Sequence, residues 1–222
     1  MKKDQTTSSQ PIFNYLHEQI ISMQIQPGQK LSENSLAKQF NISRTPVREA
    51  IARLVQLGLV EVKIKSGTFV SKLSVKNITE AQFIRQALEV AIVQRVAKAQ
   101  PTNTIEKCEQ IIALQAQAAG QNHVLEFQYL DDQFHQSLAS FTQFDRAGQI
   151  IQFEKAHLDR VRNLGLKEIG NQYDRVLNQH NAILSAIKNK NADLATQAMT
   201  QHTQEILLIL NDIQKNHLDF FE

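Results

Sequence analysis

The first third of the chain alternates between helical and strand-like patterns of apolar residues. Apolar positions recur every three or four residues over 12–25, which predicts an amphipathic helix that ends at Pro27-Gly28. A short helix over 33–40 follows, and Ser32 is placed to cap its first turn. The pattern therefore begins as two helices separated by a proline-glycine break.

A further helix is predicted to start after a tight turn at 41–43 and to end at Gly58. Pro46 falls in its first turn, where a missing amide hydrogen costs nothing. Two short strands, about 60–64 and 68–71, follow and turn at Ser66-Gly67. The order of elements favours a helix-turn-helix, at about 33–57, with a two-stranded wing.

From residue 77 onward every long segment has helical spacing, and we find no strand pattern. Six helices are predicted, at about 78–100, 103–119, 122–141, 145–164, 171–188 and 191–217. Short connections between them favour an antiparallel bundle. We therefore predict a mainly α protein, divided into a polar tail that we expect to be disordered (1–10), a winged helix-turn-helix domain (11–72), a linker (73–77) and an all-α six-helix domain (78–217).

The net charge of +2 is unevenly divided between the two domains. Residues 1–74 hold 10 Lys and Arg against 5 Asp and Glu, whereas the rest hold 14 against 17, and a basic first domain suits a polyanion. The single cysteine, Cys108, excludes an intrachain disulfide and a cysteine zinc cluster. The start of the chain lacks the apolar core of a signal peptide, and no apolar run is long enough to cross a bilayer. We expect a cytoplasmic protein with no membrane partner.

Two arginines open the second helix of the predicted helix-turn-helix. Arg44 and Arg48 are four residues apart, so they share one helix face, while the apolar residues occupy another. Arginine can make two hydrogen bonds to guanine in the major groove, worth about 1–3 kcal/mol of discrimination. The other candidate contacts to DNA are Ser43, Thr45, Lys63, Lys65 and Gly67. A solvated surface helix is the alternative, but the turn and the wing favour DNA binding.

Polar residues interrupt the apolar inner stripes of the second domain, where they cost stability unless paired. Asp131 and His135 are four residues apart and share one face. His180 and His202 lie near the middle of successive antiparallel helices, so both side chains can lie at the same height along the axis of the bundle. Three imidazoles and a carboxylate suit a divalent transition metal. Arg85, on a neighbouring stripe, is predicted to hold an anion that fills an open metal position.

For a single histidine in such a stripe, a hydrogen-bonded core position is the usual role. Four coincident polar positions favour a shared site instead. His157 and Arg160 are further candidates for the wall of a cavity. We interpret the other histidines as surface residues: His17, His123 and His217.

Residues 12–72 resemble the winged helix-turn-helix of the GntR family of bacterial transcription regulators. The resemblance is carried by Pro27-Gly28, Leu31-Ser32-Glu33, Leu36-Ala37, Ile42-Ser43-Arg44-Thr45-Pro46-Val47-Arg48-Glu49-Ala50, Leu54, Gly58-Leu59-Val60 and Gly67. It implies that Arg44, Thr45 and Arg48 contact an operator and that Gly67 lies at the wing tip. In one departure, Asn34 stands where many relatives carry an arginine that contacts DNA.

Residues 78–213 resemble the FCD domain, the helical effector domain of the FadR-like branch of that family. The residues that carry this resemblance are Arg85, Leu88-Glu89, Asp131, Phe134-His135, His180, Ile183, Asp193 and His202. It implies that Asp131 and the three histidines bind a metal, most often zinc or nickel. It also implies that the metal helps to bind a small carboxylic acid, whose carboxylate meets Arg85. Six rather than seven helices resemble the VanR-type subgroup.

The leading hypothesis is a ligand-responsive transcriptional regulator, with repression as the expected sign. A homodimer would place two recognition helices on an inverted-repeat operator in double-stranded DNA, which would associate the protein with the nucleoid. In an alternative, the metal ion itself is the signal. A remote third reading, a metal-dependent enzyme, lacks a general base at a suitable spacing and any His-Glu-x-x-His motif, so no catalytic residue is predicted.

Overall fold

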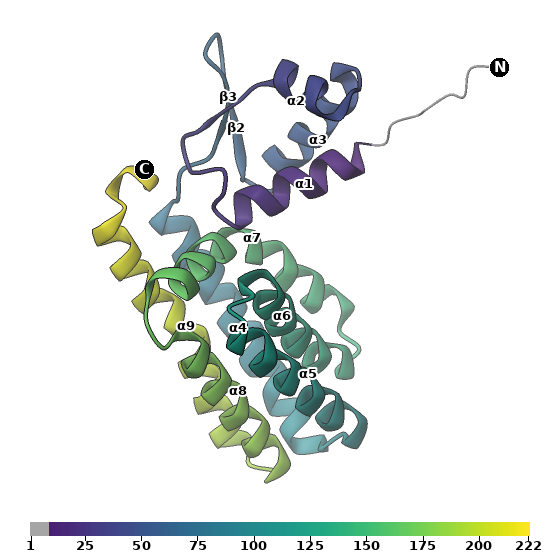
Figure 1. The fold of residues 1–222 in the computed structure, drawn as a ribbon. Coiled ribbons are helices and arrows are strands. Elements are labelled where there is room, and N and C mark those ends of the chain that lie inside the picture. Colours follow the sequence, from purple (N-terminus) through teal and green to yellow (C-terminus); the bar gives the residue numbers. More distant parts are fainter. Residues whose placement is uncertain (1–8) are drawn as a thin grey trace, which may run out of the picture. The chain divides into compact units, whose positions relative to one another are not determined.

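The computed structural model describes residues 9–222, which divide into two compact units (Figure 1). The first unit contains the described residues up to Ser74 together with His217–Glu222, and the second is Val75–Asn216. Most of the predicted tail, residues 1–8, lies outside the described part of the chain. Gln10, the last residue of the predicted tail, is instead the first residue of a helix.

The first unit is a helix-turn-helix followed by a wing, as predicted. Its elements are α1 (Gln10–Ile21), β1 (Lys30–Leu31), α2 (Glu33–Phe40), α3 (Arg44–Gln56), β2 (Val60–Lys63) and β3 (Gly67–Val70). The strands form an antiparallel sheet in the order β1-β3-β2, with Val60 opposite Val70 and Lys30 opposite Phe69. The strand β1 was not predicted, because two residues are too few to show alternation.

Local contacts explain where α2 ends and α3 begins. The Ser32 side chain accepts a hydrogen bond from the amide of Ser35 at 3.2 Å, which confirms the predicted cap of α2. Asn41 ends that helix in the left-handed conformation, with φ of 53°. Behind the turn, Val47 and Leu54 of α3 are fully buried, and α3 packs against α1. The opposite face of α3 is thereby left at the surface.

The second unit is a bundle of the six predicted helices. They are α4 (Val75–Ala99), α5 (Thr102–Gly120), α6 (Val124–Phe141), α7 (Asp145–Glu168), α8 (Gln172–Lys188) and α9 (Ala192–Asn216). Since α4 begins at Val75, the predicted linker at 73–77 is shorter than expected. The closest packing joins α4 to α9, α5 to α6 and α8 to α9, around a core that includes Phe127 and Phe134. Among the helices of residues 9–222, none is long and apolar enough to span a membrane.

The last residues of the chain return to the first unit, which the sequence did not predict. After α9, a 3-10 turn over Leu218–Phe220 carries Phe220 and Phe221, which are both buried. The amide of Leu73 donates to the carbonyl of Phe220 at 2.8 Å, and the amide of Glu222 donates to the carbonyl of Leu73 at 3.2 Å. His217, the last residue of the predicted helical domain, thus belongs instead to the first unit.

Close contact between α7 and α9 gives a test of the packing. A Cβ atom at Gly165 of α7 would lie 2.7 Å from Cγ2 of Ile209, which is fixed near the α9 backbone. In Gly165→Ala, overpacking should lower the free energy of unfolding by about 1–3 kcal/mol, whereas the better helix propensity of alanine should raise it by about 1 kcal/mol. We expect the cost of overpacking to be the larger of the two. Urea unfolding should therefore show a lower free energy of unfolding for this variant. The control is Gly120→Ala, whose Cβ would meet no atom within 4 Å. Equal stability of the two variants would contradict the packing described here.

Candidate functional site

The four predicted metal ligands meet inside the helical bundle. Asp131 and His135 come from α6, His180 from α8 and His202 from α9, and all four are buried. One ligand atom from each lies within 4.8 Å of the other three. Nε2 of His135 is 3.0 Å from Nε2 of His202, and Nε2 of His180 is 3.4 Å from Oδ1 of Asp131. Ligands that bind one ion at about 2.1 Å are separated by similar distances, about 3–4 Å.

Two glutamines fix the orientation of two of these imidazoles. Gln115 donates its amide to the carbonyl of Phe127 at 3.4 Å, so its oxygen faces Nδ1 of His180 at 2.9 Å. Gln179 donates to Glu205 at 3.3 Å, so its oxygen faces Nδ1 of His202 at 2.9 Å. An amide oxygen only accepts, and each Nδ1 therefore carries the proton. The Nε2 lone pairs of both rings are then free to bind a metal.

The third imidazole is held by a carboxylate. Nδ1 of His135 lies 3.1 Å from Oε2 of Glu89, and Oε1 of Glu89 accepts from Nε of Arg85 at 2.7 Å. Burial by itself raises the pKa of Glu89, but Arg85 and His135 outweigh it and lower this pKa to about 2. Glu89 is therefore an anion that orients His135, an interaction typical of histidines that bind metals.

The protonation states of the cluster also suit a metal ion. Burial lowers the pKa of His180 and lowers that of His202 further, so both rings are neutral at pH 7. Burial opposes ionisation of Asp131, but the Arg162 guanidinium outweighs it and holds this pKa well below its usual range. Nε2 of His180 and Oδ1 of Asp131 are buried without a hydrogen-bond partner. An unpartnered imidazole nitrogen and an unpartnered carboxylate oxygen thus lie next to the pair of His135 and His202, and a cation bound among the four side chains would satisfy them.

Charged residues of α7 hold the other side of Asp131. Arg162 pairs with Asp131, and it lies 3.4 Å from Asp159. Lys155 pairs with Asp132 and lies 3.2 Å from Asp159. These charged residues are not among the site residues predicted from the sequence. The spacing of 155, 159 and 162 places them on one helix face, which is the signal that would have found them.

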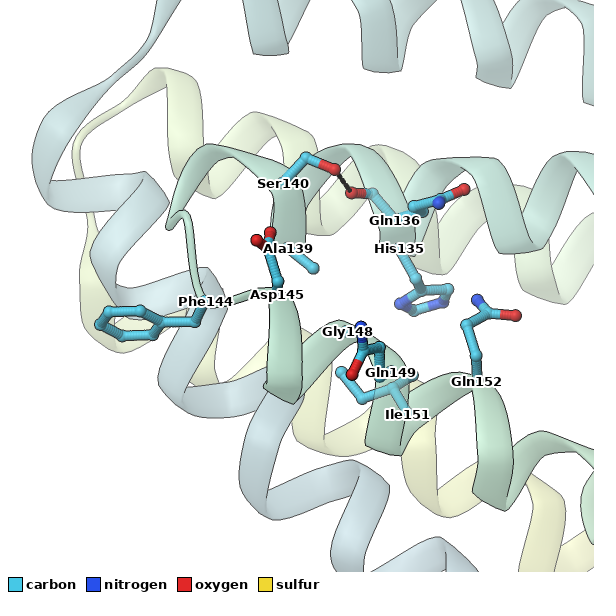
Figure 2. Close-up of a pocket in the computed structure, with 10 residues that line it drawn as sticks. All are labelled: His135, Gln136, Ala139, Ser140, Phe144, Asp145, Gly148, Gln149, Ile151 and Gln152. Carbon is cyan, nitrogen blue, oxygen red and sulfur yellow. Dashed lines mark hydrogen bonds between the residues drawn. The ribbon is translucent and has the colours of Figure 1, made fainter.

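Arg85 and the other predicted cavity residues do not border the cavity next to His135. A cavity of about 430 Å³ lies between α6 and the beginning of α7. It is lined by His135, Gln136, Ala139, Ser140, Phe144, Asp145, Gly148, Gln149, Ile151 and Gln152 (Figure 2). Arg85, His157 and Arg160 are not in this lining. Because His135 is one of the lining residues, an occupant of the cavity would touch a candidate metal ligand.

The predicted DNA contacts form two groups in the first unit. Ser43, Arg44, Thr45 and Arg48 are all exposed at the start of α3. Residues of α2 orient the arginines: Nε of Arg48 donates to Glu33 at 2.8 Å, and Arg44 donates to Asn34 at 3.2 Å. Lys63, Lys65 and Gly67 lie in the wing, where Lys65 and Gly67 have φ of 61° and 120°. Asn34, the departure noted in the sequence, thus positions an arginine.

Three of the remaining histidines are outside the cluster. His123 is exposed and lies 3.2 Å from Glu126. His17 and His217 are partly exposed, and their rings contact Phe13 and Phe220. These positions agree with the interpretation of surface residues.

Comparisons with known proteins agree with both units. The family described as bacterial regulatory proteins, gntR family, matches residues 8–70, and the FCD domain matches residues 80–205. The HTH-type transcriptional repressor RspR of Escherichia coli K12 is 34% identical over 213 residues, which cover 96% of this chain and 93% of the relative. The gluconate operon transcriptional repressor of Bacillus subtilis is 27% identical over 198 residues, covering 86% and 80%.

Solved structures show the same fold. E. coli McbR superimposes with a TM-score of 0.77 at 19% identity, covering 92% of this chain and 97% of that one. A GntR regulator from Rhodococcus sp. RHA1 superimposes with a TM-score of 0.78 at 22% identity, covering 91% and 97%. The family and the named relatives are transcriptional regulators and not enzymes. The chain therefore belongs to the GntR family of bacterial transcriptional regulators, with an FCD domain following its DNA-binding domain.

Proposed function

We propose that this protein is a repressor that binds an inverted-repeat operator as a homodimer and responds to a small carboxylic acid at a metal centre. The observation that carries the proposal is the convergence of three imidazoles and one carboxylate inside the bundle, where Nε2 of His180 and Oδ1 of Asp131 are buried without a hydrogen-bond partner. Two of the relatives are named as repressors, which supports the sign of regulation.

Asp131, His135, His180 and His202 would hold the ion. Three imidazoles and one carboxylate suit zinc or nickel. When bound, the ion would supply positive charge for a carboxylate. Arg85 is the proposed second contact of the acid, and its partner Glu89 would have to share the guanidinium. Glu89, Gln115 and Gln179 each face Nδ1 of one of the three rings. They would keep these rings in the tautomer whose Nε2 binds a metal.

Exposed side chains on α3 and in the wing would read the operator. Arg44 and Arg48 are proposed to contact bases, while Ser43, Thr45 and the wing lysines would contact phosphates. A two-fold dimer would present two such surfaces to the two halves of an inverted repeat. The acid changes operator affinity only if it binds one conformation of the protein better than the other.

The metal alone as the signal is the second candidate. The imidazoles are already oriented by their neighbours, so the ion would need little rearrangement to bind. Operator affinity measured with metal, with chelator and with acid separates the two candidates. A change between metal and chelator in the absence of any acid would favour metal sensing.

Arg48→Ala should weaken binding to the native operator about 5- to 150-fold, because one arginine contact to a base is worth about 1–3 kcal/mol. The thermal midpoint should stay nearly unchanged, since the side chain is 61% exposed and its ion pair with Glu33 is at the surface. Fluorescence anisotropy with labelled operator measures the affinity.

Arg53→Ala, on the same helix, is the matched control for Arg48→Ala. Arg53 lies over the ring of Phe13 at 3.9 Å and donates to Gln10. Its loss should lower the thermal midpoint and leave the preference for the operator over unrelated DNA intact. If Arg48→Ala were the less stable of the two and kept operator affinity, Arg48 would be structural.

His180→Ala should abolish binding of zinc or nickel, because it removes a buried ligand. Metal that binds only the folded protein stabilises it, by about 2.7 kcal/mol at a hundred times the dissociation constant, and this gain should disappear in the variant. Elemental analysis and thermal unfolding, each with and without chelator, measure both effects. His123→Ala, at an exposed position, should behave as the unmodified protein. Unchanged metal content in His180→Ala would refute the proposed site.

A further inference from the structure

Two lysines from different strands lie over the same aromatic ring in the wing. Nζ of Lys30, on β1, is 5.7 Å from the centre of the Phe69 ring on β3, and Nζ of Lys63, on β2, is 5.4 Å from it. The strand register explains this arrangement, because Lys30 and Glu61 both pair with Phe69. Lys63 follows Glu61 by two residues and therefore lies on the same face of the sheet. That face carries two cations around one aromatic ring.

The positive charge of this face is only partly neutralised. Glu61 is paired with Lys63 at 2.9 Å, and both side chains are at the surface. The ammonium group of Lys30 is exposed and forms no ion pair or hydrogen bond with another residue of the part that the structure describes. The face thus keeps a net positive charge, which suits an anion.

The glycine that begins β3 leaves room for Lys30. A Cβ atom at Gly67 would lie 2.8 Å from Cε of Lys30 and 3.3 Å from its Nζ. Gly67 is also the residue that pairs with Lys63. The Lys30 side chain therefore passes directly over the backbone of Gly67, and its ammonium group reaches the turn end of the hairpin. A side chain at position 67 would displace it.

The strand β1 fixes Lys30 relative to the recognition helix. Leu31 is buried and pairs with β3, and Ser32, the next residue, caps α2. Glu33 then accepts a hydrogen bond from Nε of Arg48 at 2.8 Å. The same short segment of chain therefore positions a cation of the wing and an arginine of α3.

We infer that Lys30 is a further DNA contact, which binds a backbone phosphate together with Lys63 over Gly67. The inference rests on the proposed DNA binding of the first unit. Lysine contacts to phosphates do not depend on base sequence. The pair would therefore add affinity and fix the position of the wing on the duplex, while the arginines of α3 read the bases.

The salt dependence of DNA binding tests this inference, because each phosphate contact releases counterions. The probe is a labelled duplex of mixed sequence, and fluorescence anisotropy measures its affinity for the full chain between about 50 and 200 mM salt. In Lys30→Gln, the slope of log affinity against log salt should become shallower by about 0.9, and the affinity at about 0.1 M salt should fall about five- to tenfold. Lys30→Arg, which keeps the charge, should retain both values.

Lys98→Gln, at an exposed position in the last turn of α4, is the matched control and should keep the slope of the unmodified chain. An unchanged slope in Lys30→Gln, with normal binding by the unmodified chain, overturns the inference and leaves the DNA-binding function intact. Equal loss of affinity in Lys30→Arg would show a structural role for the residue and would also overturn it. If the unmodified chain binds no DNA, the inference and the proposed function both fail.

Glu61→Gln should have the opposite effect to Lys30→Gln. The substitution removes the carboxylate that pairs with Lys63, so binding of the same duplex should become about two- to fivefold tighter. Unchanged or weaker binding would show that no phosphate approaches this face, which contradicts the inference.

Gly67→Ala tests whether the glycine acts through Lys30. Its φ of 120° strains an alanine in any background, whereas the clash with Lys30 exists only while the lysine is present. Gly67→Ala should therefore weaken binding of the duplex in the unmodified chain by a larger factor than in the Lys30→Gln variant. Equal weakening in both backgrounds would show that Gly67 acts independently of Lys30, and would overturn the contact over Gly67.

Discussion

The carboxylate of Asp131 is the group on which the polar interior of the helical unit depends. A buried charge is tolerated only when it is paired and hydrogen-bonded. Arg162 of α7 supplies the pairing charge, and the unpartnered oxygen faces His180 of α8. Three helices are thus tied to one side chain, so that the position of α7 relative to α8 is set by electrostatics as well as by apolar packing.

The three imidazoles around Asp131, the candidate metal ligands, do not have equivalent surroundings. His135 has a carboxylate behind it, whereas His180 and His202 have neutral amides. A carboxylate makes the imidazole a more basic ligand than an amide does. His135 is also the ring that borders the large cavity. A molecule bound in this cavity would therefore touch His135, which is the one imidazole of the three whose Nδ1 faces a charged side chain, Glu89.

Helical periodicity was sufficient to predict the bundle and to bring Asp131, His135, His180 and His202 together. In an amphipathic helix, a polar residue on the apolar stripe must face the core, and this constraint holds whatever the helix boundaries are. The supporting residues Gln115 and Gln179 were missed because glutamine is common at both buried and exposed helical positions. The network of Arg162 was missed because α7 carries many charges, and only tertiary contact shows which of them are buried.

The return of residues 217–222 to the first unit makes the DNA-binding domain discontinuous in sequence. Phe220 and Phe221 are part of the buried core of this domain, although they come after the whole helical bundle in the sequence. On the ribosome, domains generally fold in the order in which they emerge. Here the amino-terminal domain cannot complete its packing until Phe221 has been synthesised. The newly made regulator would therefore complete its DNA-binding domain only after the whole helical FCD domain has been synthesised.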